Sequence, residues 1–183
     1  EEPKAYEATM KLGEEPTTDD LTGMVILRKG WNGVTPEMIH SMFQTFLGRI
    51  QQIPPMFSAI KVKGKTLYKF DRRGIEVERK EREVEICDLQ IKEIILPHVC
   101  FKVTCSKGTY IRALGRDIGR KLGCGAHLLH LRRVQSGPFT LEQAIPWETL
   151  EDFSGAGNLS PWLIFLKEAL PGLPEVIGDE RLV

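Results

Sequence analysis

The sequence predicts an α+β protein in which strands and helices share one globular body. Before Cys105 apolar and polar residues alternate, which is the period of a half-buried strand. After Thr109 the apolar residues return at helical spacing. Those residues are Ile111, Leu114, Ile118 and Leu122. With 183 residues, 42% of them hydrophobic, the chain can bury a sizeable core.

The N-terminal part begins with a predicted strand and a polar loop. Residues 6–12 alternate up to Gly13, and residues 17–23 are hydroxyl and carboxylate residues that can bond their own backbone. Residues 24–27 are expected to form a short second strand. Thr35 caps a helix that starts at Pro36 and is predicted to end at Gly48.

The rest of the chain alternates between extended and helical patterns. The pair Pro54-Pro55 favours extended backbone over 51–61, and the phase break at Cys87-Asp88 predicts a bulge in the strand that follows. Residues 131–134 predict a short strand. Helices are expected over 147–153 and 161–170, separated by the Gly-rich stretch 154–158.

Basic residues are concentrated in the middle of a chain whose formal net charge is zero. One cluster lies within 61–82, where aromatic residues occur among the bases. Bases beside aromatic residues suit single-stranded nucleic acid, although an ordinary solvated hairpin remains an alternative. The candidate RNA-binding residues of this cluster are Lys61, Lys63, Lys65, Tyr68, Lys69, Arg72 and Arg73.

A second basic cluster lies on the helix after Thr109 and beyond it. Arg112, Arg116 and Arg120 recur every fourth residue, and like charges at that spacing destabilise an isolated helix. They therefore require an external anion or a buried acid, unless the face is simply solvated. Gly115 and Gly119 weaken the same helix and indicate close backbone packing. Lys107, Arg132 and Arg133 are further RNA-binding candidates.

The cysteines and histidines do not predict a metal site. No Cys-x-x-Cys pair occurs among the four cysteines, so reduced thiols are favoured over a zinc site. The cysteines are Cys87, Cys100, Cys105 and Cys124. His127 and His130 are expected at the surface or facing RNA. No apolar run reaches the length of a membrane span, and the first residues are acidic, which predicts a cytoplasmic protein.

Several motifs follow one another along the chain up to about Trp147. They are Lys4–Ala8, Leu12–Gly13 with Thr18–Gly23, Gln52–Lys61, Leu67–Tyr68 with Arg73–Val77, Cys105–Arg112, and Leu122–His127 with Leu131–Arg133. In this order the motifs resemble the bacterial tRNA pseudouridine synthase B (TruB) family, and together they are far more specific than any one of them.

This resemblance implies a mixed, mainly antiparallel sheet flanked by helices, with a catalytic cleft across it. It implies that Tyr6 stacks on a flipped uridine of the tRNA T-loop, and that Tyr110 and Arg112 line the pocket with Leu131. It also implies that residues 61–82 are an RNA-clamping insertion. The partner is then a tRNA T-stem-loop bound by a monomer, with no metal or cofactor.

The nucleophilic aspartate of the family precedes the Lys-x-Tyr strand, and the corresponding loop does not occur in this sequence. Asp20 lies in another context and is not assigned that role, so Arg112 is expected to await a carboxylate from outside the chain. We therefore expect residues 1–153 to be a partial catalytic domain, inactive alone, and 154–183 to lead towards an RNA-binding domain outside the sequence.

The sequence leaves two other functions open as alternatives. One is a non-catalytic RNA-binding or chaperone module that keeps the base pocket and the basic insertion. The other is a nucleotide enzyme that uses Lys107-Gly108-Thr109 as a phosphate loop, although a P-loop needs glycine before its Lys-Ser/Thr pair.

Overall fold

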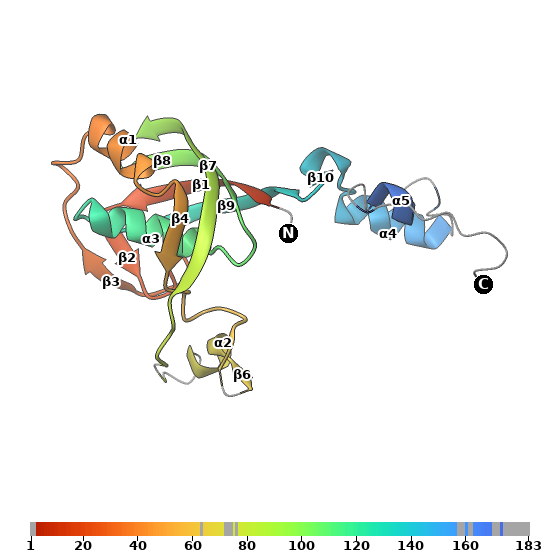
Figure 1. Cartoon of the computed structure of the whole chain (residues 1–183), viewed down its shortest axis with the longest axis horizontal. Helices are drawn as coiled ribbons and strands as arrows, with labels where there is room; N and C mark the ends of the chain where they lie inside the picture. The colour runs from red at the N-terminus through yellow and green to blue at the C-terminus, as the bar shows by residue number, and fades with distance from the viewer. Residues whose placement is uncertain are drawn as a thin grey trace. The chain divides into compact units, whose positions relative to one another are not determined.

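The structure, a computed structural model, divides the chain into two compact units (Figure 1). The first unit covers residues 1–137 and the second covers 138–183. The residues that the structure describes are 3–62, 64–71, 75, 77–156, 160, 163–169 and 173.

Five strands of the first unit form a single antiparallel sheet in the order β9-β1-β8-β7-β4. The strands are β1 (Lys4–Leu12), β4 (Gly48–Gln52), β7 (Arg82–Ile95), β8 (His98–Cys105) and β9 (Ala126–Ser136). The register of β7 against β8 shifts between Ile86 and Asp88, which confirms the predicted bulge. The predicted fold class, a mainly antiparallel sheet flanked by helices, is also confirmed.

Two helices, α1 (Pro36–Gln44) and α3 (Ile111–Lys121), cover one face of this sheet (Figure 1). The Thr35 side chain accepts a hydrogen bond from the Met38 amide, as expected of an N-cap. Phe43 of α1 meets Phe101 of β8 edge-on at 5.4 Å between ring centroids. The core therefore lies between the helices and alternate residues of β1 and β8.

Helix α3 lies close to β9 because two of its residues have no side chain. A Cβ atom on Gly119 would fall 2.3 Å from the Ala126 amide nitrogen, and one on Gly115 would fall 3.0 Å from Leu128. This confirms that the two glycines permit close packing. It also sets the height of the arginine side chains of α3 above the sheet.

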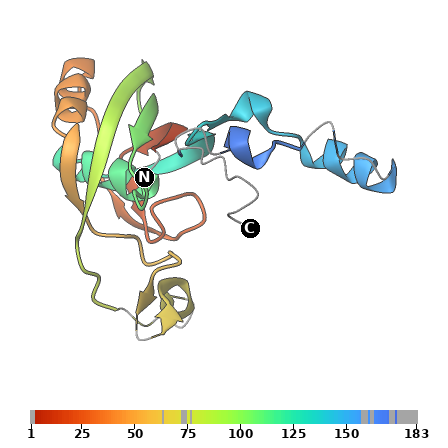
Figure 2. The ribbon, with the colours of Figure 1, turned by 45° about the vertical axis from the view of Figure 1, so that its right-hand side comes forward.

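The remaining elements of the first unit lie in two connections. A hairpin of β2 (Glu14–Pro16) and β3 (Val25–Arg28) follows β1. The connection between β4 and β7 carries β5 (Lys61–Val62), β6 (Lys65–Thr66) and α2 (Leu67–Asp71), which lie beyond the ends of those strands in both Figure 1 and Figure 2. The predicted basic insertion coincides with this connection.

The second unit contains short elements. They are β10 (Phe139–Thr140), a 3-10 turn (Leu141–Gln143), α4 (Trp147–Ala156) and α5 (Leu166–Ala169). The boundary predicted at residue 153 between a catalytic domain and a linker stays a prediction. Among the described residues, no helix is both long enough and apolar enough to cross a membrane.

Several predicted elements differ from the structure. Helix α1 ends at Gln44, and Gly48 instead opens β4 with a φ of +83°. Strand β4 was not predicted, because Gly48–Gln52 is mostly polar and its pairing with β7 depends on distant residues. Strand β9 is longer than the predicted 131–134 and begins with three buried residues. Helix α4 continues to Ala156 instead of 153, and α5 is shorter than the predicted 161–170.

Candidate active site

The three arginines of α3 are each paired with a different acid from the segment 15–20. Arg112 Nη1 lies 2.7 Å from Asp20 Oδ2, and Arg116 Nη1 lies 2.9 Å from Asp19 Oδ2. Arg120 forms a forked ion pair with Glu15. The predicted alternatives were an external anion, a buried acid and a solvated face. The structure shows that acids within the chain are the partners of the three arginines.

Asp20 is held by hydrogen bonds on both of its oxygens. Its Oδ1 accepts from Thr18 Oγ1 at 2.7 Å, from the Thr22 amide at 3.0 Å and from Thr22 Oγ1 at 2.5 Å. Burial by itself raises the pKa of Asp20, but the bonds from Thr22, Thr18 and Arg112 together bring that pKa below its usual value. Asp20 is therefore an ionised carboxylate whose acceptor sites are already used.

This pair corrects one expectation about Arg112. The expected carboxylate from outside the chain is not needed to satisfy the guanidinium, because Asp20 already holds it. Arg112 also donates to the Thr18 carbonyl at 3.2 Å and to the Phe57 carbonyl at 2.8 Å. The fork thus ties the start of α3 to two loops, which a lysine could not do with one nitrogen.

Arg112 forms one side of an open pocket of about 550 Å³. The pocket is lined by Phe57, Ser58, Ala59, Tyr68, Tyr110 and Arg112. The rings of Phe57 and Tyr68 lie 6.2 Å apart and are tilted by 60°, and the Arg112 guanidinium lies 6.0 Å from the centre of the Phe57 ring. Aromatic faces beside a fixed cation suit a planar, polar ligand such as a nucleobase.

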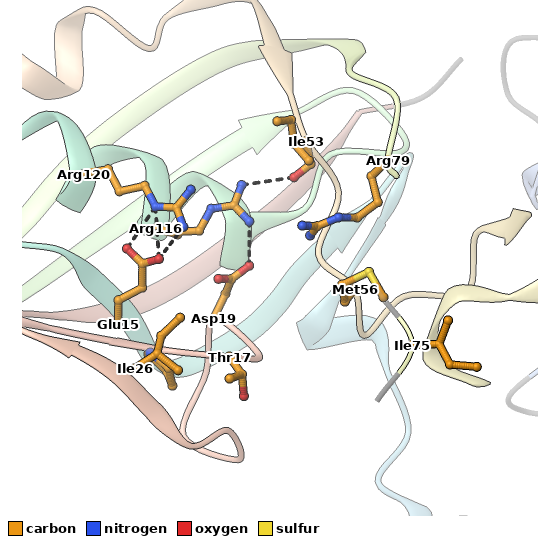
Figure 3. A pocket seen from close by; sticks show the side chains of 11 residues that line it. Glu15, Thr17, Asp19, Ile26, Ile53, Met56, Ile75, Arg79, Arg116 and Arg120 are labelled. Carbon is orange, nitrogen blue, oxygen red and sulfur yellow. Dashed lines mark hydrogen bonds and ion pairs between the residues drawn. The ribbon is translucent and has the colours of Figure 1, made fainter. Parts of the chain in front are cut away.

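A second cavity, of about 400 Å³, lies beside the Arg116 pair (Figure 3). Asp19 and Arg116 are both almost fully buried there, and Asp19 has a φ of +62°. Burial raises the pKa of Asp19 to about 6, despite the opposing attraction of Arg116. Arg116 Nη2 donates to the Ile53 carbonyl and Arg79 donates to the Pro54 carbonyl, so guanidinium groups also hold the segment that follows β4.

Tyr6 and Leu131 do not line the pocket that contains Tyr110 and Arg112. Tyr6 is half-buried in β1, opposite Val103 and Arg133, and packs against the core. Leu131 is 42% exposed on β9, opposite Ala8. The structure thus brings together two of the four predicted pocket residues.

The predicted RNA-binding residues lie in different parts of the first unit. Lys107, Arg132 and Arg133 are exposed, and Tyr68 lines the pocket. For Lys61, Lys65 and Lys69 the structure describes the backbone alone, and Lys63, Arg72 and Arg73 lie outside the described residues.

Two contributors to the site were missed by sequence reasoning. Phe57 was seen only as part of a motif, and Gln52 was not singled out. The one available signal was the Pro54-Pro55 pair between them, which favours extended backbone over a helix for this segment. Their partners on α3 are more than fifty residues away, so no local pattern points to them.

The structure also shows where the histidines and cysteines discussed above lie. His127 is buried, and its Nδ1 lies 3.2 Å from the Glu14 carbonyl, so the expectation of a surface histidine is wrong for His127 although it holds for His130. The four cysteines are free, as predicted. Within the described part of the chain, no three His, Cys, Asp or Glu residues cluster as a metal site would require.

Two solved structures with a similar fold are complexes of several components. The chain aligns with a chain in the crystal structure of a Cbf5-Nop10-Gar1 complex with a TM-score of 0.61 and 29% identity, covering 87% of this chain and 39% of that one. It also aligns with an H/ACA RNP bound to a substrate RNA containing 2'-deoxyuridine, with a TM-score of 0.57 and 25% identity, covering 87% and 38%.

Family models assign the sequence more closely. Residues 1–111 match the TruB family pseudouridylate synthase N-terminal domain, and residues 112–160 match the tRNA pseudouridylate synthase B C-terminal domain. The chain therefore belongs to the TruB family of pseudouridylate synthases.

Curated relatives carry the name tRNA pseudouridine synthase B. The protein of Geobacter sulfurreducens is 46% identical over 170 residues, which are 93% of this chain and 56% of the relative. That of Clostridium kluyveri is 41% identical over 183 residues, which are 100% of this chain and 62% of the relative. The chain thus spans between half and two thirds of the length of these relatives.

Proposed function

We propose that the protein containing this chain is a tRNA pseudouridine synthase that isomerises the uridine at position 55 of the T-loop. The carrying observation is the pocket in which Tyr110 and Arg112 meet Phe57 and Tyr68. The family assignment and the names of the relatives support the same activity. In this reaction the N-glycosidic bond of the uridine breaks, the uracil rotates, and a carbon–carbon bond to the ribose replaces it.

Aromatic residues supply the energy needed to hold the target base outside the RNA stack. Flipping a base costs a few kcal/mol, and stacking on an aromatic side chain returns roughly 1–3 kcal/mol. We propose Tyr6 as the residue that stacks on the flipped base, and Tyr110, Arg112 and Leu131 as further residues that contact this base. Because Tyr6 and Leu131 lie outside the pocket of Tyr110 and Arg112, RNA would have to contact both regions.

Arg112 and Asp20 have distinct roles in this proposal. Arg112 presents a fixed positive charge that can orient a carboxylate or the substrate, while Asp20 holds its fork in place. Asp20 is a poor nucleophile because both of its oxygens accept hydrogen bonds. We propose that the nucleophilic aspartate lies outside this chain and that the chain alone does not turn over.

The basic residues define how the RNA would be held. The basic segment 61–82 makes up most of the connection between β4 and β7, and that connection contributes Phe57 and Tyr68 to the pocket. We propose that this connection and the exposed Lys107, Arg132 and Arg133 contact the phosphates of a T-stem-loop. The protein would act as a monomer on cytoplasmic tRNA.

The experiment compares this chain with a version extended upstream, each mixed with a T-stem-loop RNA. Nucleosides from digested RNA are separated by chromatography, because pseudouridine and uridine have equal mass. We expect pseudouridine from the extended version and none from the chain alone. An RNA with cytidine at the target position is the matched control.

The outcomes separate the competing hypotheses. Turnover by the chain alone would show that the nucleophile is present in it. Tight binding without turnover by the extended version would favour the non-catalytic RNA-binding module. Affinity should fall steeply between low and moderate salt, since phosphate contacts release counterions. An affinity insensitive to salt would contradict the proposed basic interface.

A further inference from the structure

Gln52 forms a two-point contact with the backbone of a pocket residue. It is the last residue of β4, and it is only 2% exposed. Its Oε1 accepts a hydrogen bond from the Tyr110 amide at 2.8 Å, and its Nε2 donates to the Tyr110 carbonyl at 3.1 Å. A buried amide side chain thus pairs with a backbone residue as a neighbouring strand would.

The position of Tyr110 explains why such a contact is needed. Tyr110 is the N-cap residue of α3, has extended backbone angles and provides no capping hydrogen bond from its own side chain. Its carbonyl accepts the first bond of the helix from the Leu114 amide at 3.0 Å, but its own amide lies outside the helix ladder. Gln52 satisfies this amide and fills the second acceptor site of the carbonyl.

Gln52 lies between the two segments that line the pocket, Phe57–Ala59 and the start of α3. The segment that follows Gln52 contains Ile53 and Phe57. The Ile53 carbonyl accepts a hydrogen bond from Arg116, and the Phe57 carbonyl accepts one from Arg112. One wall of the pocket is therefore the direct continuation of Gln52, and the other begins at the Tyr110 backbone that Gln52 holds. A shift of the Gln52 amide would change the spacing between the aromatic ring of Phe57 and the start of α3.

We propose that Gln52 is a positioning residue for the isomerisation: it sets the place of Tyr110 and Arg112 relative to the segment Phe57–Ala59. This inference rests on the proposed function, since it assigns a role within that site. Gln52 does not touch the substrate in this proposal and acts only through the Tyr110 backbone. Its loss should therefore reduce the chemical step more than the binding of RNA.

The test uses Gln52→Leu and Gln52→Glu in the whole protein that contains this chain. Leucine keeps the apolar stem but loses both hydrogen bonds, while an ionised glutamate loses the donor and places charge against the Tyr110 carbonyl. The matched controls are Gln51→Leu and Gln51→Glu, because Gln51 is the neighbouring residue of β4 and is exposed.

The measurements are the single-turnover rate of pseudouridine formation, the Kd for the T-stem-loop RNA and the melting temperature. We expect both Gln52 variants to lose at least about tenfold in rate, because displacement of a site by about 1 Å can cost about a hundredfold. The Kd should change by less than about threefold in the variants that stay folded at the assay temperature, as expected for loss of transition-state positioning. The Gln51 variants should match the wild type.

A second measurement keeps the test independent of turnover. In this chain, hydrogen exchange at the Tyr110 amide should become faster in Gln52→Leu, whereas exchange at the Leu114 amide should not. A normal rate in a folded Gln52→Leu protein overturns the positioning role alone. An inactive wild-type extended protein overturns the proposed function, and the positioning role with it. Equal acceleration at both amides shows general loosening and also contradicts the proposal.

Discussion

Asp19→Asn removes a negative charge from beside Arg116 while keeping the size of the side chain. Two effects oppose each other at this site. Breaking a buried ion pair by removing one partner commonly costs about 3–5 kcal/mol. Burial of the Asp19 carboxylate, however, raises its pKa from 3.8 to about 6, which means that folding shifts the equilibrium towards the neutral form even with Arg116 present.

The pKa of Asp19 decides whether Asp19→Asn is expected to stabilise or destabilise the fold. The folded state binds a proton below about pH 6, and the unfolded state binds it only below about 3.8. The stabilisation from this proton is fully present below the lower value and is lost as pH rises through the higher one. Over that window the wild type loses about 3 kcal/mol, because one pKa unit corresponds to about 1.4 kcal/mol.

A neutral asparagine does not undergo this loss. Asn also tolerates the left-handed backbone at this position, where φ is +62°, and its carbonyl can still accept from Arg116. Arg116 keeps its bond to Asp117 at 2.8 Å. We therefore expect Asp19→Asn to be more stable than the wild type at pH 7, by up to about 3 kcal/mol, and within about 1 kcal/mol of it near pH 4.

The assay is urea unfolding of both proteins, followed by circular dichroism at pH 7 and pH 4. Glu93→Gln, at an exposed position of β7, is the control for the loss of one negative charge. Lower stability of Asp19→Asn than of the wild type at pH 7, with the gap closing on acidification, would refute the reasoning. It would show that attraction to Arg116 exceeds the cost of burying the carboxylate.

Three further substitutions test other parts of the structure. Gly119→Ala should destabilise the fold by about 3 kcal/mol in urea unfolding, because its Cβ would lie 2.4 Å from the Cβ of Ala126; a neutral effect would mean that α3 moves freely over β9. Tyr6→Ala in the extended protein should lower turnover more than melting temperature, and the reverse would make Tyr6 a core residue. Arg112→Lys should reduce turnover at least about tenfold, since the guanidinium fork is lost; near-normal turnover would remove Arg112 from the site.

The elements with a strong local period could be predicted from the sequence. Alternation predicted β1 and β8, and the helical spacing after Thr109 predicted α3, because these patterns depend only on which face of each element is buried. The arginine spacing on α3 also implied acids or an anion nearby, since three like charges on one face repel each other.

Which side chains meet depends on the tertiary fold. The sheet and the hairpin after β1 bring Asp20 to Arg112, which is 92 residues away in the chain, and β4 brings Gln52 to Tyr110 across 58 residues. No local period carries such information, because the partners are selected by strand pairing and by the close approach of α3 to β9. The arginine predicted to await a carboxylate already has one for this reason.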